Sequence, residues 1–195
     1  MIAIIDYDMG NIRSVENALI RAGAEWTLTA DPDTIRRADR VILPGVGHCG
    51  EAMARLRERG LTEVICSLRR PVLGICVGMQ VMCRHSEEGD TECLGLFDTR
   101  VRRLPESSGV KVPDMGWCRL SNTEGRLFEG VGRGAYAYFV HSYYAHTCSD
   151  TIATSRHGDM LISAALKWEN FTGTQFHPEK SGDVGQQIIH NFLEL

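Results

Sequence analysis

The stretch VLGICVGMQ at residues 72–80 decides how this chain folds and which chemistry it can carry. Residues 72–75 form a short apolar run, typical of a strand that is buried on both faces. Residues 77–85 have the apolar spacing of a helix. Between them, the pattern G-x-C-x-G gives Cys76 a glycine two residues before it and another two residues after it. A sharp turn from strand to helix crowds the backbone, so we expect both positions to require a very small residue.

The alternation of strand and helix extends along the first half of the chain. Short apolar runs are followed by segments in which apolar residues recur with helical spacing. The predicted strands span residues 2–5, 26–28, 41–43 and 72–75, and the predicted helices span residues 11–22, 51–59, 61–68 and 77–85. Continuous apolar strands that alternate with helices predict a parallel sheet covered on both faces.

The second half of the chain has a different pattern, with short strands separated by Gly, Asn, Ser and Pro. These predicted strands span residues 97–101, 117–120, 136–140, 151–154, 161–166 and 171–175, and a last helix spans residues 183–193. No internal repeat or linker divides the sequence. We therefore predict one α/β domain over residues 1–195, with a central mixed, mostly parallel sheet, flanking helices and added antiparallel strands.

Composition excludes several classes of function. The 21 Lys and Arg residues against 25 Asp and Glu residues give a net charge of −4, so no strong positive field attracts nucleic acid or anionic lipid. No apolar run approaches the ~20 residues of a membrane span, and the first residues do not resemble a signal peptide. The seven cysteines are an odd number without a regular framework, which favours reduced thiols and a cytoplasmic location.

Cys76 is the candidate nucleophile because of its place in the G-x-C-x-G turn. At the start of a helix, the helix dipole favours a thiolate over a thiol. The backbone N–H of Val77 points toward the same space in such a turn and can help to hold an oxyanion. The alternative is a buried structural cysteine, which is the common fate of a free cysteine and our interpretation of the other six.

A thiolate nucleophile needs a base, and His177 is the histidine with an orienting group at a diagnostic spacing. In the stretch TQFHPE at residues 174–179, His177 and Glu179 are two residues apart. On extended backbone they lie on one side, so Glu179 can accept a hydrogen bond from the imidazole. A lone H-P-E would be interpreted as an exposed turn with an incidental charge pair. Together with Cys76, it predicts a Cys-His-Glu triad.

Two other motifs permit different interpretations. The stretch GVGHCG at residues 45–50 matches the dinucleotide pattern G-x-G-x-x-G, although that pattern normally follows the first strand of a sheet. A tight turn is a simpler interpretation, and a third is that its amides hold an oxyanion. Cys83, His85 and Cys93 are soft metal ligands in a short stretch, but no C-x-x-C pair or fourth ligand gives the spacing of a zinc site.

Taken together, these residues resemble the class I, triad-type glutamine amidotransferases. Within that family the chain is similar to the glutaminase subunits of imidazole glycerol phosphate synthase, from about residue 2 to residue 193. The resemblance is carried by DYDMGN at 6–11, LPGVG at 43–47, GICVGMQ at 74–80, SEEG at 86–89, KVP at 111–113, MGW at 115–117, YFVHSY at 138–143 and GTQFHPEKSG at 173–182. It implies a flavodoxin-like fold.

The resemblance also implies roles for individual residues. Cys76 is the nucleophile, His177 the base and proton carrier, and Glu179 the orienting group. Gly45, Val46 and Gly47 supply oxyanion-hole amides after a peptide rotation. The residues that it implies for holding glutamine are Gly78, Gln80, Glu88, His141, Ser142 and Tyr143. The residues that it implies for the partner interface are Asn11, Trp117, Tyr138 and Lys180.

The implied activity is hydrolysis of L-glutamine to glutamate and ammonia through a cysteinyl thioester, without a metal or organic cofactor. The ammonia passes to a (β/α)₈-barrel cyclase subunit that forms a heterodimer with this chain and makes imidazole glycerol phosphate and an aminoimidazole carboxamide ribotide. The sequence departs from the family pattern at Val77, where Leu is usual, at Asp114, where His is common, and at Cys118, where Asn is common.

Three alternatives remain open at the level of sequence. A related amidotransferase could supply ammonia to a synthase that amidates sugars. A stand-alone cysteine hydrolase, such as a γ-glutamyl hydrolase, could use the same triad without a partner. A regulatory binding module could keep the turn around Cys76 as a relic, although the intact H-P-E argues against it.

Overall fold

The computed structural model describes residues 1–106 and 111–195. Its largest sheet has seven strands in the order β11-β12-β13-β4-β3-β1-β2. These strands are β1 (Ile2–Ile5), β2 (Trp26–Thr29), β3 (Arg40–Leu43), β4 (Val72–Ile75), β11 (Thr151–His157), β12 (Met160–Trp168) and β13 (Phe171–Thr174). The pairs from β13 through β4, β3 and β1 to β2 are parallel, and β11-β12 and β12-β13 are antiparallel. The predicted mixed, mostly parallel sheet is confirmed.

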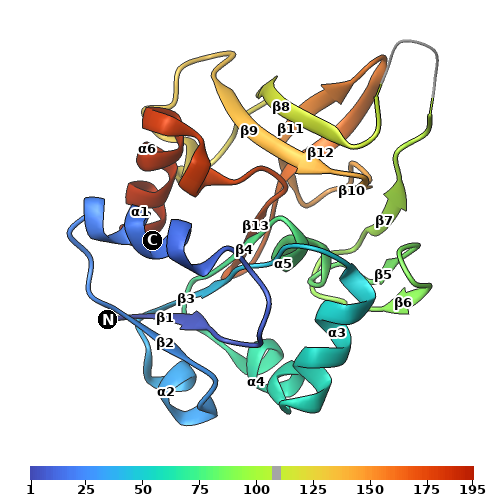
Figure 1. Ribbon diagram of the computed structural model, residues 1–195. Helices are drawn as coiled ribbons and strands as arrows, with labels where there is room; N and C mark the ends of the chain where they lie inside the picture. Colours follow the sequence, from blue (N-terminus) through green and yellow to red (C-terminus); the bar gives the residue numbers. More distant parts are fainter. Residues whose placement is uncertain (107–110) are drawn as a thin grey trace.

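Helices cover this sheet on two sides (Figure 1). Helices α1 (Ile12–Arg21) and α6 (Gly182–Leu193) pack together on one side, next to the 3-10 turns η1 (Arg126–Phe128) and η2 (Pro178–Lys180). Helices α2 (Pro32–Arg37), α3 (Cys49–Glu58) and α4 (Leu61–Ser67) form the other group, which α5 (Val77–Gln80) joins through α3. Among the described residues, no helix combines the length and the apolar character needed to cross a bilayer.

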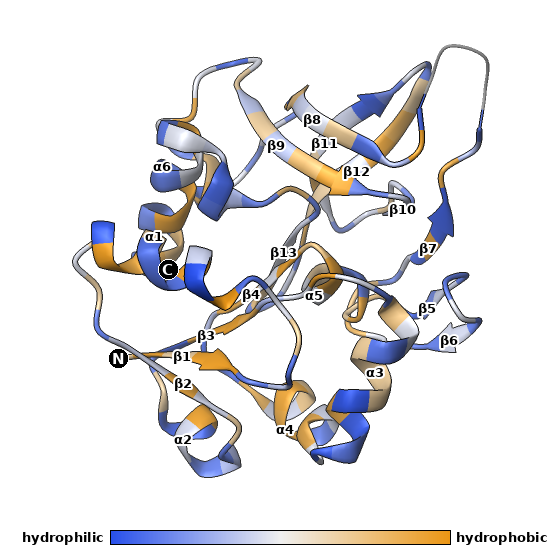
Figure 2. Ribbon diagram, in the orientation of Figure 1, coloured by the Kyte–Doolittle hydropathy of each residue, from blue (hydrophilic) through white to orange (hydrophobic). Residues whose placement is uncertain are grey.

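Two small sheets extend the domain beyond the central sheet. One contains β10 (Tyr143–Ala145), β7 (Arg100–Arg103), β5 (His85–Ser86) and β6 (Thr91–Glu92), in that order. The other is an antiparallel ribbon of β8 (Asp114–Arg119) and β9 (Tyr136–His141), in which Asp114 pairs with His141. Apolar residues dominate β1 and β9, whereas the arginine-rich β7 is hydrophilic (Figure 2).

The core lies between the central sheet and the two groups of helices. All four residues of β1, of β4 and of β13 are buried, which explains why their sequences are continuous apolar or small runs. Helix α1 buries Val15, Ala18 and Leu19, a stripe with the spacing expected from the sequence. The strands that carry the functional residues therefore lie inside the packed part of the molecule.

The helix predicted for residues 77–85 is wrong in its length. Helix α5 ends at Gln80, and His85 belongs to β5. The reason is that the carbonyls of Val81, Met82 and Cys83 accept hydrogen bonds from the amides of residues 94–97, so the returning loop replaces further helical turns. The same contacts engage the Phe97 amide, and the strand predicted for residues 97–101 starts only at Arg100.

Four short elements were not predicted from the sequence: α2, β5, β6 and β10. Helix α2 had a readable start signal, since the Asp31 side chain accepts a hydrogen bond from the Thr34 amide at 2.9 Å and Pro32 occupies the first turn. The three strands are only two or three residues long, and each depends on pairing with a distant segment. Such strands leave no periodic signal in the sequence.

Candidate active site

The turn after β4 presents Cys76 in an unusual backbone conformation, with φ of 54° and ψ of −110°. A non-glycine residue with positive φ is strained by about 1–3 kcal/mol and persists only where its surroundings hold it. A Cβ added to Gly74 would lie 2.7 Å from the Gly78 carbonyl oxygen, and one added to Gly78 would lie 1.9 Å from the Leu43 carbonyl oxygen. The requirement for glycine on both sides of Cys76 is confirmed.

The sheet order brings three segments that are distant in sequence to the edge where β4 ends. Strand β4 lies between β3, which leads into residues 44–47, and β13, which leads into His177. The Cys76 amide donates a hydrogen bond to the Thr174 carbonyl at 2.7 Å, so the turn is fixed to the end of β13. Parallel strands expose their carboxyl ends at one edge, which is the usual position of sites in such sheets.

His177 and Glu179 form the ion pair that the sequence predicted. Nδ1 of His177 lies 2.8 Å from Oε1 of Glu179, and both side chains are buried. Burial lowers the pKa of His177, but hydrogen bonding and charge interactions with Cys76 and Glu179 outweigh it and raise the pKa to about 10. Among the described residues, Nε2 of His177 has no hydrogen-bond partner of good geometry, so it is free to exchange a proton with the neighbouring Cys76 thiol.

A cavity of about 310 Å³ opens next to these groups, at the lower end of the range for small-molecule sites. The residues that line it are Val46, Gly47, Cys76, Val77, Gln80, Glu88, Pro113, Val140, His141, Ser142, Tyr143 and His177. Cys76 and His177 thus open onto a common cavity, which is the central expectation from the sequence. The cavity therefore brings together the predicted nucleophile, the predicted base and most of the predicted glutamine residues.

Of the residues predicted for the triad, the oxyanion hole and glutamine, three do not line this cavity. Glu179 lies behind His177, as an orienting group should. Gly45 and Gly78 pack against one another: a Cβ on Gly45 would lie 2.4 Å from the Gly78 amide nitrogen. Both glycines therefore let the turn after β3 approach the turn around Cys76.

The side-chain amide of Gln80 is hydrogen-bonded to other residues of the protein. Its Nε2 donates to the Tyr143 carbonyl at 2.9 Å and to Oε1 of Gln175 at 3.0 Å. Gln175 in turn places its Nε2 3.7 Å from the Cys76 sulfur. Sequence reasoning missed Gln175 as a site residue, together with Pro113 and Val140 in the cavity wall. All three stand inside or beside the quoted motifs, and that proximity was the available signal.

Glu88 and the turn that starts α3 are also connected. Oε2 of Glu88 accepts a hydrogen bond from the Cys49 amide at 2.7 Å, and the Glu88 amide donates to the Ser86 hydroxyl. The His48 ring accepts from the Gly50 amide at 3.0 Å and so caps the start of α3. The stretch at residues 45–50 therefore forms a turn beside Cys76 that leads into α3.

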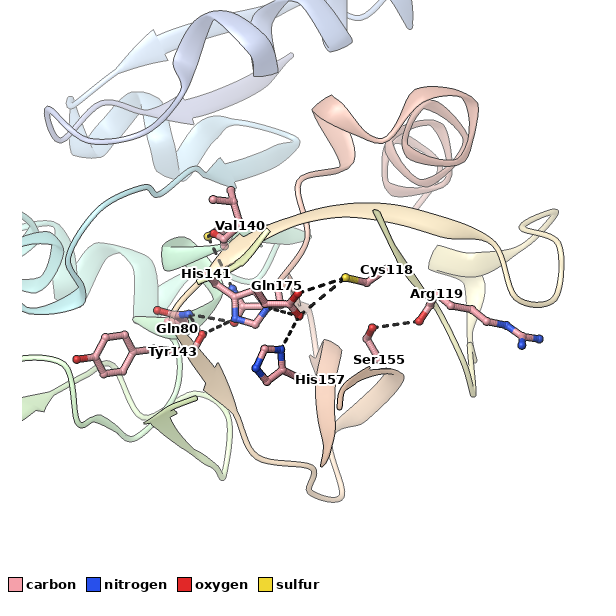
Figure 3. A network of polar contacts seen from close by, with 11 residues as sticks. Gln80, Cys118, Arg119, Val140, His141, Tyr143, Ser155, His157 and Gln175 are labelled. Carbon is pink, nitrogen blue, oxygen red and sulfur yellow. Dashed lines mark hydrogen bonds and ion pairs between the residues drawn. The ribbon is translucent and has the colours of Figure 1, made fainter. Parts of the chain in front are cut away.

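His141 also lines the cavity and belongs to a second polar cluster (Figure 3). Its Nδ1 lies 2.8 Å from the Tyr143 carbonyl, and its Nε2 lies 3.9 Å from the Asp114 carboxylate. The same carboxylate approaches His157 at 3.3 Å and the Cys118 sulfur at 3.7 Å. Burial lowers the pKa of His141 to about 4, which the Tyr143 carbonyl and Asp114 only partly oppose. His141 is therefore neutral at pH 7.

The outer face of the β8–β9 ribbon carries exposed apolar residues. Trp117 is 55% exposed, and its ring makes an edge contact with Tyr138 at a centroid distance of 6.2 Å. Nζ of Lys180 lies 6.0 Å from the Tyr138 ring centre. Three of the four residues predicted at an interface are thus close together. Asn11 precedes α1, which contacts the turn that carries Lys180.

The short α5 changes one part of the prediction for Cys76. A single helical turn carries only a small part of the dipole of a long helix, so His177 is the main group available to stabilise a thiolate. The other six cysteines are free thiols outside the cavity wall. In residues 1–106 and 111–195, no group of His, Cys, Asp and Glu has the arrangement of a metal site.

Comparison with known sequences gives consistent matches over the whole chain. The profile described as "Glutamine amidotransferase class-I" matches residues 3–195. Proteins named "Imidazole glycerol phosphate synthase subunit HisH" are similar from Bacteroides thetaiotaomicron, with 49% identity, and from Bacteroides fragilis strain YCH46, with 51% identity. Each comparison covers 100% of this chain and 99% of the relative. The protein of that name from Xanthomonas oryzae pv. oryzae is 46% identical, with 100% and 97% covered.

Solved structures share the fold at much lower identity. A putative GMP synthase component from Thermoplasma acidophilum superposes with a TM-score of 0.76 at 20% identity, covering 99% of this chain and 92% of the other. A structure described as a glutamine amidotransferase gives a TM-score of 0.75 at 19% identity, covering 98% and 97%. At this identity, the likeness is evidence for the fold alone.

Proposed function

The chain belongs to the class I glutamine amidotransferases, and we propose that its residues 1–195 form one glutaminase domain in which Cys76, His177 and Glu179 are the catalytic triad. Similarity over the full chain makes it, within that family, the glutaminase subunit of an imidazole glycerol phosphate synthase, in histidine biosynthesis. The observation that carries the site assignment is the His177–Glu179 ion pair at 2.8 Å, in a cavity lined by both Cys76 and His177.

In the first half of the reaction, the Cys76 thiolate attacks the side-chain amide carbon of L-glutamine. A carbon–sulfur bond forms, and the amide oxygen becomes an oxyanion. The carbon–nitrogen bond then breaks while the imidazolium of His177 gives its proton to the departing nitrogen, which leaves as ammonia. The raised pKa of His177 supports this role, because the ring carries a proton before the bond breaks.

In the second half, water hydrolyses the resulting thioester. Neutral His177 takes a proton from the water as its oxygen attacks the acyl carbon, and the carbon–sulfur bond breaks. Glutamate leaves, and Cys76 returns to a thiolate beside protonated His177. Glu179 stabilises the imidazolium throughout and keeps Nδ1 of the ring turned away from the cavity.

The oxyanion is assigned to backbone amides of Val46, Gly47 and Val77, which line the cavity beside Cys76. Gly45 contributes by allowing this turn to pack on the Cys76 turn. Loss of one oxyanion donor costs roughly 3–4 kcal/mol in comparable enzymes, so the position of this turn strongly affects the rate.

The remaining cavity residues are assigned to glutamine. Glu88 supplies a carboxylate for the substrate ammonium group, while its other contact is with the Cys49 amide. Ser142, Tyr143 and the neutral His141 also line the cavity. Gln80 holds the Tyr143 backbone, and Gln175 holds the Cys76 sulfur, so the two amides fix the relative positions of these groups.

A cyclase with a (β/α)₈ barrel is the assigned partner, as a heterodimer, with L-glutamine as substrate. Ammonia released into water becomes ammonium, which no longer reacts as a nucleophile, so its use requires transfer to an acceptor site. The exposed surface of Trp117, Tyr138 and Lys180 fits a protein partner, since large exposed aromatic residues are typical of interfaces.

The triad is tested by the change Cys76→Ala, assayed together with the cyclase partner in the presence of its nucleotide substrate. Glutamine-dependent synthesis is expected to disappear, whereas synthesis from ammonium salts persists, because the acceptor site lies on the partner. The matched control is Cys148→Ala, which removes a half-buried thiol outside the cavity. Equal loss with both nitrogen sources would contradict the assignment.

The partner surface is tested by the change Trp117→Glu, which places a charge on the outer face of β8. Affinity for the cyclase partner, measured by calorimetry, is expected to fall by about 100-fold or more, as for a central interface tryptophan. Trp168→Glu is the control, because Trp168 is also exposed but lies at the end of β12. Equal affinity of the two variants would exclude this surface.

A further inference from the structure

Ser181 stands at the first boundary of α6 but does not cap the helix. Serine at this position normally accepts a hydrogen bond from an amide in the first helical turn, which stabilises the helix by about 1 kcal/mol. Here the Ser181 side chain makes no such bond, although the residue is only 1% exposed. A buried hydroxyl that does not cap the helix is expected to have other hydrogen-bond partners.

Those partners are the backbone groups of His177 and Tyr138. The Ser181 hydroxyl donates to the His177 carbonyl at 2.7 Å and accepts from the Tyr138 amide at 2.9 Å. In addition, the His177 amide donates directly to the Tyr138 carbonyl at 2.9 Å. In a regular antiparallel pair, two residues exchange both hydrogen bonds directly. His177 and Tyr138 exchange one directly and the other through the Ser181 hydroxyl.

This bridge determines where the base stands. His177 follows β13 and precedes the η2 turn, so its amide is held by Tyr138, and its carbonyl is held by Ser181 and by the Lys180 amide of the same turn. Glu179 cannot fix it independently, because Glu179 belongs to the same short turn and moves with it. Catalytic groups lose efficiency when they are misplaced by about 1 Å, and the reach from His177 to Cys76 depends on this backbone.

The bridge also connects the base with the outer surface. The residue that shares the hydroxyl with His177 is Tyr138, whose ring contacts Trp117 and lies near Lys180. A shift of the β9 backbone at Tyr138 is therefore transmitted to His177 through one direct hydrogen bond and through the Ser181 hydroxyl, which is bonded to both residues.

We propose that Ser181 is a positioning residue, whose hydroxyl bridges Tyr138 and His177 and thereby holds the imidazole in register with Cys76. This inference rests on the proposed glutaminase function. It assigns to Ser181 no contact with substrate; its effect is transmitted by the main chain of His177.

The test compares Ser181→Ala with Ser155→Ala. Ser155 is an equally buried serine that also donates to a backbone carbonyl, that of Arg119 at 3.1 Å, outside the cavity. Active sites are first counted by titration with a glutamine-mimicking electrophile that labels Cys76, so that misfolded protein is removed from the comparison. The kcat and KM for glutamine are then measured per titrated site, and the labelling rate is followed against pH.

For Ser181→Ala, we expect kcat per site to fall by about tenfold or more while KM stays within about twofold, because the base is displaced and the substrate wall is not. We also expect labelling to require a higher pH, since a displaced imidazolium stabilises the thiolate less well. Ser155→Ala should leave kcat per site and the pH profile unchanged. Equal kcat per site and equal pH profiles for the two variants would overturn the inference.

Two further variants cover the case in which Ser181→Ala does not fold. Ser181→Thr keeps the hydroxyl, and Ser181→Cys fills the space with a much weaker hydrogen-bonding group. The inference requires the threonine variant to exceed the cysteine variant in kcat per site, and equal values would overturn it. Turnover by Cys76→Ala, in contrast, would overturn the proposed function and not the role of Ser181.

Discussion

His177 and His141 both line one cavity, but their surroundings shift the pKa of the imidazole in opposite directions. Both imidazoles are buried, which by itself lowers the pKa of a histidine. His177 nevertheless has its pKa raised to about 10, because Glu179 at 2.8 Å and the Cys76 thiol stabilise its charged form. His141 has its pKa lowered to about 4, with a carbonyl at 2.8 Å and the Asp114 carboxylate only at 3.9 Å.

The difference teaches that the partners within hydrogen-bond reach decide the pKa of each imidazole in this cavity. Burial acts on both rings, so it does not distinguish them. Cys76 and Glu179 together offset burial at His177, whereas His141 has a carbonyl partner at 2.8 Å and a carboxylate only at 3.9 Å. As a result, the imidazole beside Cys76 favours its charged form, and the imidazole of His141 favours its neutral form.

The substitution Glu179→Gln is expected to reduce the difference between the pKa values of His177 and His141 most strongly. The amide keeps most of the shape but removes the charge that holds His177 as an imidazolium, so the pKa of His177 should move toward that of His141. By comparison with other catalytic triads, kcat/KM for glutamine should fall on the order of 10²–10⁴-fold. Steady-state kinetics measure this loss, and thermal unfolding checks that the fold is retained. Activity above a tenth of wild type would contradict the role of Glu179.

The neutral state of His141 should make the fold sensitive to acid. Below pH 6.5 an unfolded histidine binds a proton that buried His141 does not bind until about pH 4, so stability falls as the pH decreases through this interval. The expected loss from this residue is about 3 kcal/mol. Urea titrations from pH 7 to pH 4 measure it. The variant His141→Gln should show a shallower decline, and an unchanged slope would show that other groups dominate.

His177 should make the folded state less stable as the pH rises, whereas His141 does so as the pH falls. Its folded-state pKa lies above that of an unfolded histidine, so its stabilising contribution is complete below pH 6.5 and is lost as the pH rises through about 10. Urea titrations from pH 7 to pH 10.5 should therefore show a decline in wild type that is smaller in His177→Gln. Parallel curves for the two proteins would argue against a charged His177.

The smallest effect is expected from Asp114→Asn. His141 is neutral with Asp114 charged and stays neutral without that charge, so kcat/KM at pH 7–8 should fall by less than about threefold. The same kinetic assay as for Glu179→Gln provides the measurement. A loss comparable to that of Glu179→Gln would show that the distant carboxylate matters as much as the close one, and the contrast between the two imidazoles would fail.

The surroundings of His177 could be predicted from the sequence, because local rules determine them. Glycines two residues on either side of Cys76 are required by backbone contacts as short as 1.9 Å for an added Cβ. His177 and Glu179 stand two residues apart, and their pairing depends only on local backbone. The parallel strands were predictable for the same reason, since burial on both faces leaves continuous apolar runs.

The surroundings of His141 could not be predicted in the same way. The approach of Asp114 to His141 depends on the register of β8 against β9, and the approach of His157 depends on β11, which is distant in sequence. The early end of α5 has a similar origin, because amides of residues 94–97 take carbonyls that a longer helix would have used. Gln175 was missed because its two partners, Gln80 and Cys76, are almost a hundred residues away.

The position of β13 between β4 and β12 has a consequence for synthesis of the chain. Until residues 171–174 have left the ribosome, β4 has no neighbour on one side, and the segment with the imidazole and its carboxylate, which follows them in the chain, is not yet available to pair with Cys76. A nascent or truncated polypeptide therefore carries the thiol without its base, together with an open, apolar strand edge of the kind that invites aggregation. Folding and reactivity are thus coupled, because the last strand of the chain both covers the edge of β4 and leads into the imidazole.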